Sequence, residues 1–139
     1  MVGRLLGVDH GDRRIGLAIS DPTPMIATPL KTITVHNAQE AIDAIKDVVK
    51  EYDIVLVVVG LPIGMRGQET AQTKHVNKFV DDLINNEISV ALQDERLTSV
   101  SAKRSLLEQQ KKASKNKGLV DQIAATILLQ QYIDIHYND

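Results

Sequence analysis

The chain opens with three short runs of aliphatic and β-branched residues that are separated by turn-forming residues. These runs are Arg4–Val8, Ile15–Ile19 and Pro29–Val35. Glycine, aspartate and proline between them favour tight turns, and runs of this length rich in valine, isoleucine and threonine are typical of strands. The pattern therefore predicts an antiparallel meander of three strands.

The hydrophobic period changes after the third run. Apolar residues recur at steps of three and four across Ala38–Tyr52, which predicts an amphipathic helix, with Asn37 as its N-cap. Ile54–Val59 is apolar throughout, as expected of a strand buried on both faces. A second helical stripe, which ends at Asn85–Asn86, is made of Val76, Phe79, Val80, Leu83 and Ile84.

The last third of the chain repeats this alternation. Ile88–Leu92 is predicted to be a fifth strand and Ser99–Gln110 a third helix. Lys111–Gly118 is polar and is predicted to be a loop, and Leu119–His136 is predicted to be the fourth helix. Three antiparallel strands followed by βα units predict an α/β fold, a five-stranded mixed sheet with helices on both faces. The chain has no linker or repeat, so residues 1–139 are expected to form one domain.

Composition narrows the class of protein. Apolar residues make up 43% and charged residues 24% of the chain, which excludes a disordered, coiled-coil or fibrous protein. The absence of cysteine excludes disulfides, thiolate metal sites and a cysteine nucleophile. We see neither a secretory leader nor an apolar run long enough to cross a bilayer, so we expect a cytoplasmic protein without membrane contact.

Basic residues are concentrated in one segment. The whole chain has a formal net charge of −2, yet the segment Lys103–Lys117 holds six basic residues and one acid, Glu108. This local charge is a candidate surface for an anionic partner.

Three acids lie where secondary structure changes. Asp9 and Glu95 follow predicted strands, and Asp121 lies in the first turn of the predicted last helix, on its apolar side. Each has a simpler interpretation: a turn residue, a solvated neighbour of Arg96, and a partner of the helix dipole. A carboxylate on an apolar helix face is nevertheless costly unless it is paired or bound to a metal, so the three could converge on one site.

The histidines and aromatic residues indicate neither a metal site nor a surface for bases. The spacing of His10, His36, His75 and His136 does not suggest a zinc site. The few aromatic side chains offer no platform on which bases could stack. Recognition of a nucleic acid would therefore depend on its phosphates and its shape.

Four strings follow one another along nearly the whole chain: DHGDRRIGLAISD (9–21), VVVGLPIGMRGQET (57–70), LQDERLTS (92–99) and GLVDQIAATILLQQYID (118–134). Together they resemble the YqgF family, bacterial RNase H-like proteins described as Holliday junction resolvases and as pre-16S rRNA nucleases. The DER triplet, Asp94 to Arg96, is the most specific match. The chain departs from the family at Arg66 and in the segment 111–117, which lacks the usual arginine.

The resemblance implies an RNase H-like fold and a metal-dependent nuclease site made of Asp9, Glu95 and Asp121. Two Mg²⁺ or Mn²⁺ ions bound by carboxylates can activate a water and stabilise the leaving oxygen of a phosphodiester. Asp9 is expected to bridge the two ions, with Glu95 and Asp121 each serving one. Asp94 is the alternative to Glu95, since adjacent residues in a turn cannot be separated from sequence.

Six basic residues are the expected contacts of a nucleic-acid backbone. They are Arg14, Arg96, Lys111, Lys112, Lys115 and Lys117. Arg14 and Arg96 could instead neutralise the acids.

These observations leave several functions open. The first is an endonuclease that matures the 5′ end of pre-16S rRNA, with the ribosomal particle as partner, or one that resolves branched DNA. The second is an actin-like nucleotide-binding protein, which would need two such domains to enclose ATP. The third is a catalytically silent nucleic-acid-binding domain. The sequence also allows a homodimer.

Overall fold

The computed structural model describes residues 3–95 and 117–137. Within these ranges the elements follow one another as β1 (Arg4–His10), β2 (Arg14–Ser20), β3 (Ala27–Thr34), α1 (Ala38–Glu51), β4 (Ile54–Leu61), α2 (Ala71–Asn85), β5 (Val90–Asp94) and α4 (Lys117–His136). The predicted helix Ser99–Gln110 lies outside the described residues.

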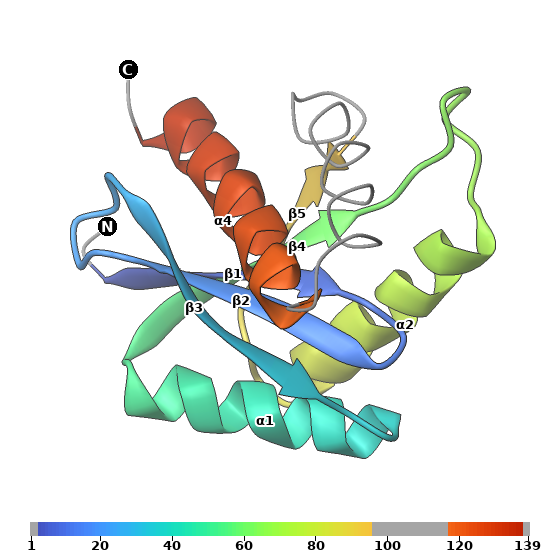
Figure 1. Cartoon of the computed structure of the whole chain (residues 1–139), viewed down its shortest axis with the longest axis horizontal. Helices are drawn as coiled ribbons and strands as arrows, with labels where there is room; N and C mark the ends of the chain where they lie inside the picture. The colour runs from blue at the N-terminus through green and yellow to red at the C-terminus, as the bar shows by residue number, and fades with distance from the viewer. Residues whose placement is uncertain (1–2, 96–116, 138–139) are drawn as a thin grey trace.

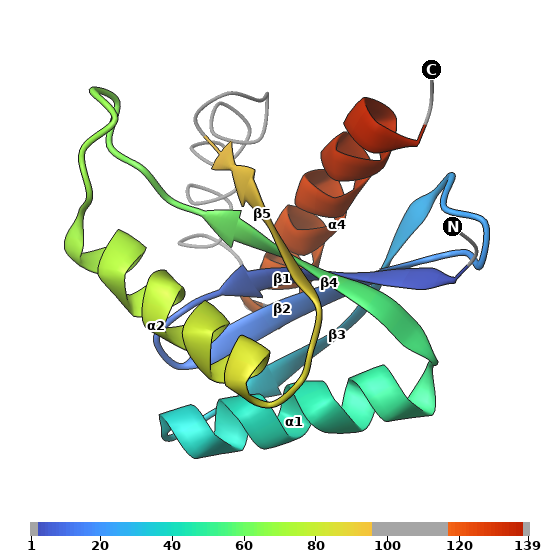
Figure 2. The same cartoon turned by 180° about the vertical axis from the view of Figure 1, so that it is seen from behind.

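The five strands form one mixed sheet in the order β3-β2-β1-β4-β5. β1, β2 and β3 pair antiparallel, whereas β4 is parallel to both β1 and β5. Helices α1 and α2 cover one face and α4 crosses the other, as the two opposite views show (Figures 1 and 2). The predicted α/β fold, with its mixed sheet and helices on both faces, is confirmed.

Two apolar cores lie on the two faces of the sheet. The larger joins inward side chains of the strands, such as Val8 and Val57, to the apolar stripes of α1 and α2. The smaller lies under α4 and includes Leu5, Val58 and Leu129. Since side chains alternate along a strand, these two sets identify which residues of each strand face α4.

The strands β1 and β4 end two residues later than predicted, and the strands β3 and β5 begin two residues away from their predicted starts. β3 begins at Ala27 rather than Pro29, because Pro29 is accommodated on an edge strand, opposite an irregularity in the β2 register. β5 begins at Val90 rather than Ile88, because Ile88 lies in the turn that follows α2, where its backbone N–H donates to the Leu83 carbonyl. The strand consequently continues to Asp94.

The last helix also begins earlier than predicted. Lys117 and Gly118 belong to α4 rather than to a loop, and the Gly118 carbonyl accepts a hydrogen bond from the Thr32 hydroxyl, which docks this part of the helix on β3. Asp121 therefore lies in the second turn of the helix instead of the first. In residues 3–95 and 117–137 we find no helix long and apolar enough to span a membrane.

Candidate active site

Asp9 lies near the end of the central strand and faces α4. A Cβ atom on Gly7, two residues earlier on the same face, would lie 2.7 Å from the Leu129 Cβ of that helix. Alternation along β1 places the Asp9 side chain on this face as well. Asp9 is only partly buried, so it lies where the sheet meets solvent.

Gly16 brings the backbone of Asp121 next to Asp9. In the β1–β2 ladder Gly16 is the partner of Asp9. A Cβ atom on Gly16 would lie 2.2 Å from the carbonyl oxygen of Asp121 and 3.0 Å from its Cβ. Only glycine allows such an approach, so α4 places a buried acid directly beside the strand position opposite Asp9.

Gly60 has the same effect on the other side of Asp9. Val8 pairs with Val59 in the parallel β1–β4 ladder, so Gly60 lies beside Asp9. A Cβ atom on Gly60 would lie 2.6 Å from Oε1 of Glu95, which is itself buried. The three acids predicted from sequence thus share one face and one edge of the sheet.

The strand register separates Asp94 from Glu95. Asp94 is the last residue of β5 and pairs with Leu61. Val90, four residues earlier, packs in the core under α1 and α2, so alternation directs Asp94 to that opposite face. Glu95, and not Asp94, has its carboxylate on the Asp9 side of the sheet.

Arg14 is the ion-pair partner that the structure gives to Asp121. The Arg14 Nε donates a hydrogen bond of 2.8 Å to Asp121 Oδ2. Arg14 comes from the first residue of β2 on the same face, and its side chain is 34% exposed, whereas that of Asp121 is 8% exposed. The cation offsets the cost of burying the carboxylate and keeps part of the guanidinium at the surface.

The three acids do not form a closed set of metal ligands. Among the residues described, no group of three or more aspartate, glutamate or histidine side chains is close enough to hold a metal ion jointly. The Arg14 pair occupies one Asp121 oxygen, Oδ2, with a cation. The donor type nevertheless suits Mg²⁺ or Mn²⁺, because carboxylate oxygens are the ligands these ions prefer.

The predicted phosphate contacts are only partly described. Lys117 is exposed at the first residue of α4, one helical turn before Asp121. Arg96, Lys111, Lys112 and Lys115 lie outside the described residues.

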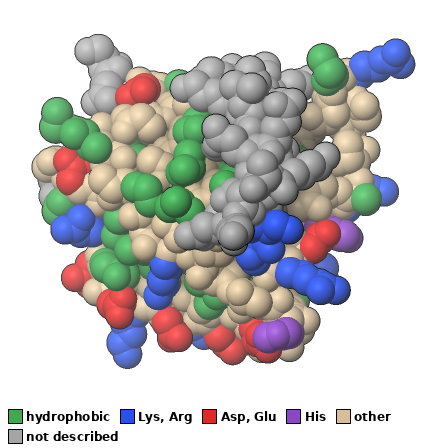
Figure 3. Space-filling view, viewed as in Figure 1, with side chains coloured by type: hydrophobic (Ala, Val, Ile, Leu, Met, Phe, Trp, Pro, Cys, Tyr) green, Lys and Arg blue, Asp and Glu red, His purple; other side chains and the backbone are tan. Residues whose placement is uncertain are grey.

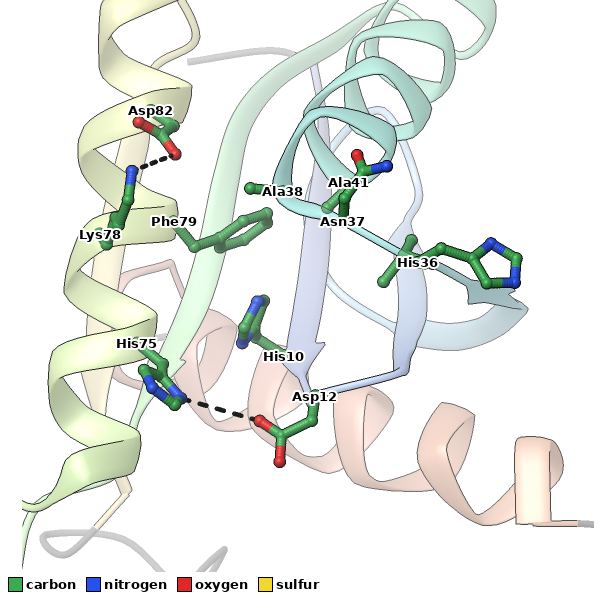
Figure 4. A pocket seen from close by; sticks show the side chains of 11 residues that line it. His10, Asp12, His36, Asn37, Ala38, Ala41, His75, Lys78, Phe79 and Asp82 are labelled. Atoms are coloured by element: carbon green, nitrogen blue, oxygen red, sulfur yellow. Dashed lines mark hydrogen bonds and ion pairs between the residues drawn. The ribbon is translucent and has the colours of Figure 1, made fainter.

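A cavity of about 310 Å³ opens on the opposite face of the sheet, between α1 and α2. His10 and Asp12 line it, together with His75 and Phe79 of α2 (Figure 4). The His10 ring lies against Phe79 with centroids 4.5 Å apart, and burial lowers its pKa although Asp12 and Asp9 act in the opposite direction. His10 is next to Asp9 in the chain, but its cavity lies on the other face from the sheet edge that carries Asp9, Glu95 and Asp121, which we call the acidic edge.

Comparison with known proteins identifies the family. The model of the RuvX family, described as Holliday junction resolvase, matches residues 3–135. The chain belongs to the RuvX (YqgF) family. Relatives support this: proteins named "Putative pre-16S rRNA nuclease" from Chloroflexus aggregans and Clostridium tetani are 45% and 42% identical, over 96% and 97% of this chain and 95% and 99% of theirs.

Solved structures share the fold. RuvC of T. thermophilus in complex with a Holliday junction substrate superposes with a TM-score of 0.59 at 14% identity, over 97% of each chain. The Fowlpox virus resolvase, also bound to Holliday junction DNA, gives 0.55 at 12% identity, over 96% of this chain and 99% of that one. The expected RNase H-like fold is thereby confirmed, and family membership makes this RuvX protein a nuclease.

Proposed function

We propose that this RuvX protein is a metal-dependent endonuclease that cleaves structured RNA and matures the 5′ end of pre-16S rRNA. One observation carries the chemistry: two glycines on the strands beside Asp9 let Asp121 and Glu95 approach it from either side. The names of relatives at about 40–45% identity support the substrate. This substrate would imply the ribosomal particle as partner and a cytoplasmic location.

Asp9, Glu95 and Asp121 would hold the metal, with Asp9 central. Two bound ions would activate the attacking water and stabilise the leaving oxygen. The chain itself supplies the orientation of its acids, since packing on Gly16 and Gly60 limits how Asp121 and Glu95 can move. Arg14 holds Asp121 in place and, being partly exposed, can also donate to a substrate phosphate.

Branched DNA is the second candidate substrate. The matching family model is described as a Holliday junction resolvase, which favours this alternative. A homodimer would suit a two-fold junction, and the mass of the protein in solution tests it.

The decisive experiment compares Asp9→Asn with Asp12→Asn. Both remove one charge from the same short segment, but Asp12 is exposed and lines the cavity on the opposite face. With Mg²⁺, we expect Asp9→Asn to lose cleavage of a pre-16S rRNA fragment while its circular dichroism and melting temperature stay close to the parent. Asp12→Asn should cleave normally.

A four-way DNA junction is assayed in parallel. Faster cleavage of the junction than of the RNA would favour the alternative substrate. Cleavage by a folded Asp9→Asn protein would refute the proposed site.

A further inference from the structure

The loop between β4 and α2 begins at the acidic edge and extends outward. β4 ends at Gly60 and Leu61, and Glu95 lies against Gly60. Figures 1 and 2 both show the following segment reaching away from the sheet before it turns back into α2. A substrate that extends from the three acids along this segment can therefore meet the loop.

The tip of the loop has a defined turn. The Gly64 N–H donates to the Gln68 carbonyl at 2.9 Å, and the Gly67 N–H donates to the Gly64 carbonyl at 2.8 Å. The Gln68 side chain accepts from the Arg66 N–H at 2.9 Å. Gly67 has a φ of 82°, a left-handed conformation that favours glycine. Hydrogen bonds among residues 64–68 thus stabilise one conformation of the turn.

Both ends of the loop are anchored to α2. The hydroxyl of Thr73, a buried residue, donates to the Pro62 carbonyl. Thr70 caps α2 in a reciprocal capping box with Thr73. Hydrogen bonds to α2 therefore fix both ends of this loop, residues 62–70, which we call the projection.

This projection displays one apolar and one cationic side chain. Met65 is 95% exposed, against 62% for Ile26, the next most exposed large hydrophobic side chain in the described part of the chain. Arg66 is exposed beside it. A single exposed methionine is ordinary on a surface. Here, however, it sits on a turn that is held in place and that starts at the acidic edge.

We propose that the Met65–Arg66 turn engages the nucleic-acid substrate beside the cleavage point, and this inference rests on the proposed nuclease function. Arg66 contacts a backbone phosphate, and Met65 packs against an unstacked base. Apolar side chains, methionine included, act as wedges between base steps in other nucleic-acid complexes. Such a wedge favours substrates with a bulge, a branch or a helix end, where unstacking costs least.

The test uses an inactive Asp9→Asn background and two probes, a bulged RNA duplex and a four-way DNA junction. Each probe carries 2-aminopurine at its bulge or branch point. The fluorescence of 2-aminopurine rises when this base unstacks. Met65→Ser is compared with Met25→Ser, since Met25 is also exposed but lies at the opposite end of the sheet. Arg66→Gln is compared with Lys50→Gln, an exposed charge at the end of α1.

We expect Met65→Ser to abolish the fluorescence rise and to weaken binding by about tenfold, or about 1.4 kcal/mol. Arg66→Gln should reduce the slope of log affinity against log salt by about 0.7–0.9, the contribution of one phosphate contact. Both control variants should behave as the background protein.

Unchanged fluorescence with Met65→Ser, or an unchanged salt slope with Arg66→Gln, would overturn the inference. The proposed function would stand in that case, because it depends on cleavage by the Asp9 parent and its loss in Asp9→Asn. Conversely, a parent that binds these probes without cleaving either would refute the proposed function alone.

Discussion

Gly16 and Gly60 lie on either side of Asp9, and a methyl group added at each would meet different atoms. A methyl group on Gly16 would meet the backbone of Asp121, which cannot move without shifting α4. A methyl group on Gly60 would meet the far end of the Glu95 side chain and two Leu128 methyl groups. Gly16 therefore allows α4 to pack closely on β2, and Gly60 leaves room for the Glu95 carboxylate.

Gly16→Ala and Gly60→Ala should separate stability from activity. We expect Gly16→Ala to cost about 3 kcal/mol or more of unfolding free energy, at or above the upper end for overpacking, because backbone must move. Gly60→Ala should cost less than about 1.5 kcal/mol, because side-chain ends can yield, yet cleavage should fall sharply as Glu95 is displaced.

Urea unfolding measures the first quantity and RNA cleavage at fixed Mg²⁺ the second. If Gly60→Ala cleaved as fast as the parent, Glu95 would not need the position it occupies here. If Gly16→Ala were as stable as the parent, the close packing of α4 on Gly16 would not contribute to the free energy of unfolding.

At the level of elements, two helices begin with side-chain caps that have different surroundings. α2 is capped by Thr70 and Thr73, and Thr73 also binds the Pro62 carbonyl of the projecting loop. α1 is capped by Asn37, whose side chain accepts from the Glu40 N–H on the face opposite the acids. Loss of either cap leaves backbone N–H groups at the start of a helix without a partner. Only the cap of α2 also holds the projecting loop.

Thr73→Val and Asn37→Ala should therefore have similar effects on stability and different effects on substrate. Each is expected to lower the free energy of unfolding by about 1–2 kcal/mol. Only Thr73→Val should weaken binding of the bulged RNA, because it releases the base of the loop. Fluorescence anisotropy at a temperature well below both melting transitions measures this. Equal affinities for the two variants would mean that the loop does not depend on its anchor.

At the scale of the whole molecule, three elements distant in sequence supply the acids of one sheet edge. β1 and α4 contribute one carboxylate each, the residue after β5 contributes the third, and the sheet order places β1 in the middle. Two basic residues described near Asp121 are Arg14, its ion-pair partner, and Lys117, four residues earlier in α4. Figure 3 shows this side of the molecule, on which Lys and Arg side chains are spread over several separate places.

Such a site should depend on a divalent ion of the right size. Mg²⁺ or Mn²⁺ should support turnover, and excess chelator should abolish it. Ca²⁺ should allow binding with little cleavage, because its longer and looser coordination misaligns the in-line reaction. Cleavage of pre-16S rRNA fragments and anisotropy binding are measured on the same samples. Full activity in chelator would contradict the metal assignment, and equal rates with Ca²⁺ would contradict the two-ion geometry.

The sequence by itself determined the order of the described elements, the mixed sheet and the three acids as candidates. Hydrophobic period is a local property, so α1 with its Asn37 cap and the buried strand β4 were predicted close to their observed limits. Contacts between elements distant in sequence were not predicted: the Thr32 hydroxyl of β3 donates to the Gly118 carbonyl of α4. That residues 1–139 form one nuclease domain stays a prediction.

Only the tertiary structure decided how the acids are arranged. Sequence could not separate Asp94 from Glu95, because the choice depends on which face each residue of β5 presents. It could offer Arg14 only as a nearby cation, because its partner Asp121 lies 107 residues away. In the sequence Gly60 is only the residue after the predicted strand Ile54–Val59, yet in the folded chain it makes room for Glu95. Local patterns specify faces and periods, whereas a site made by three strands and a helix depends on register and packing, which are determined across the whole sheet.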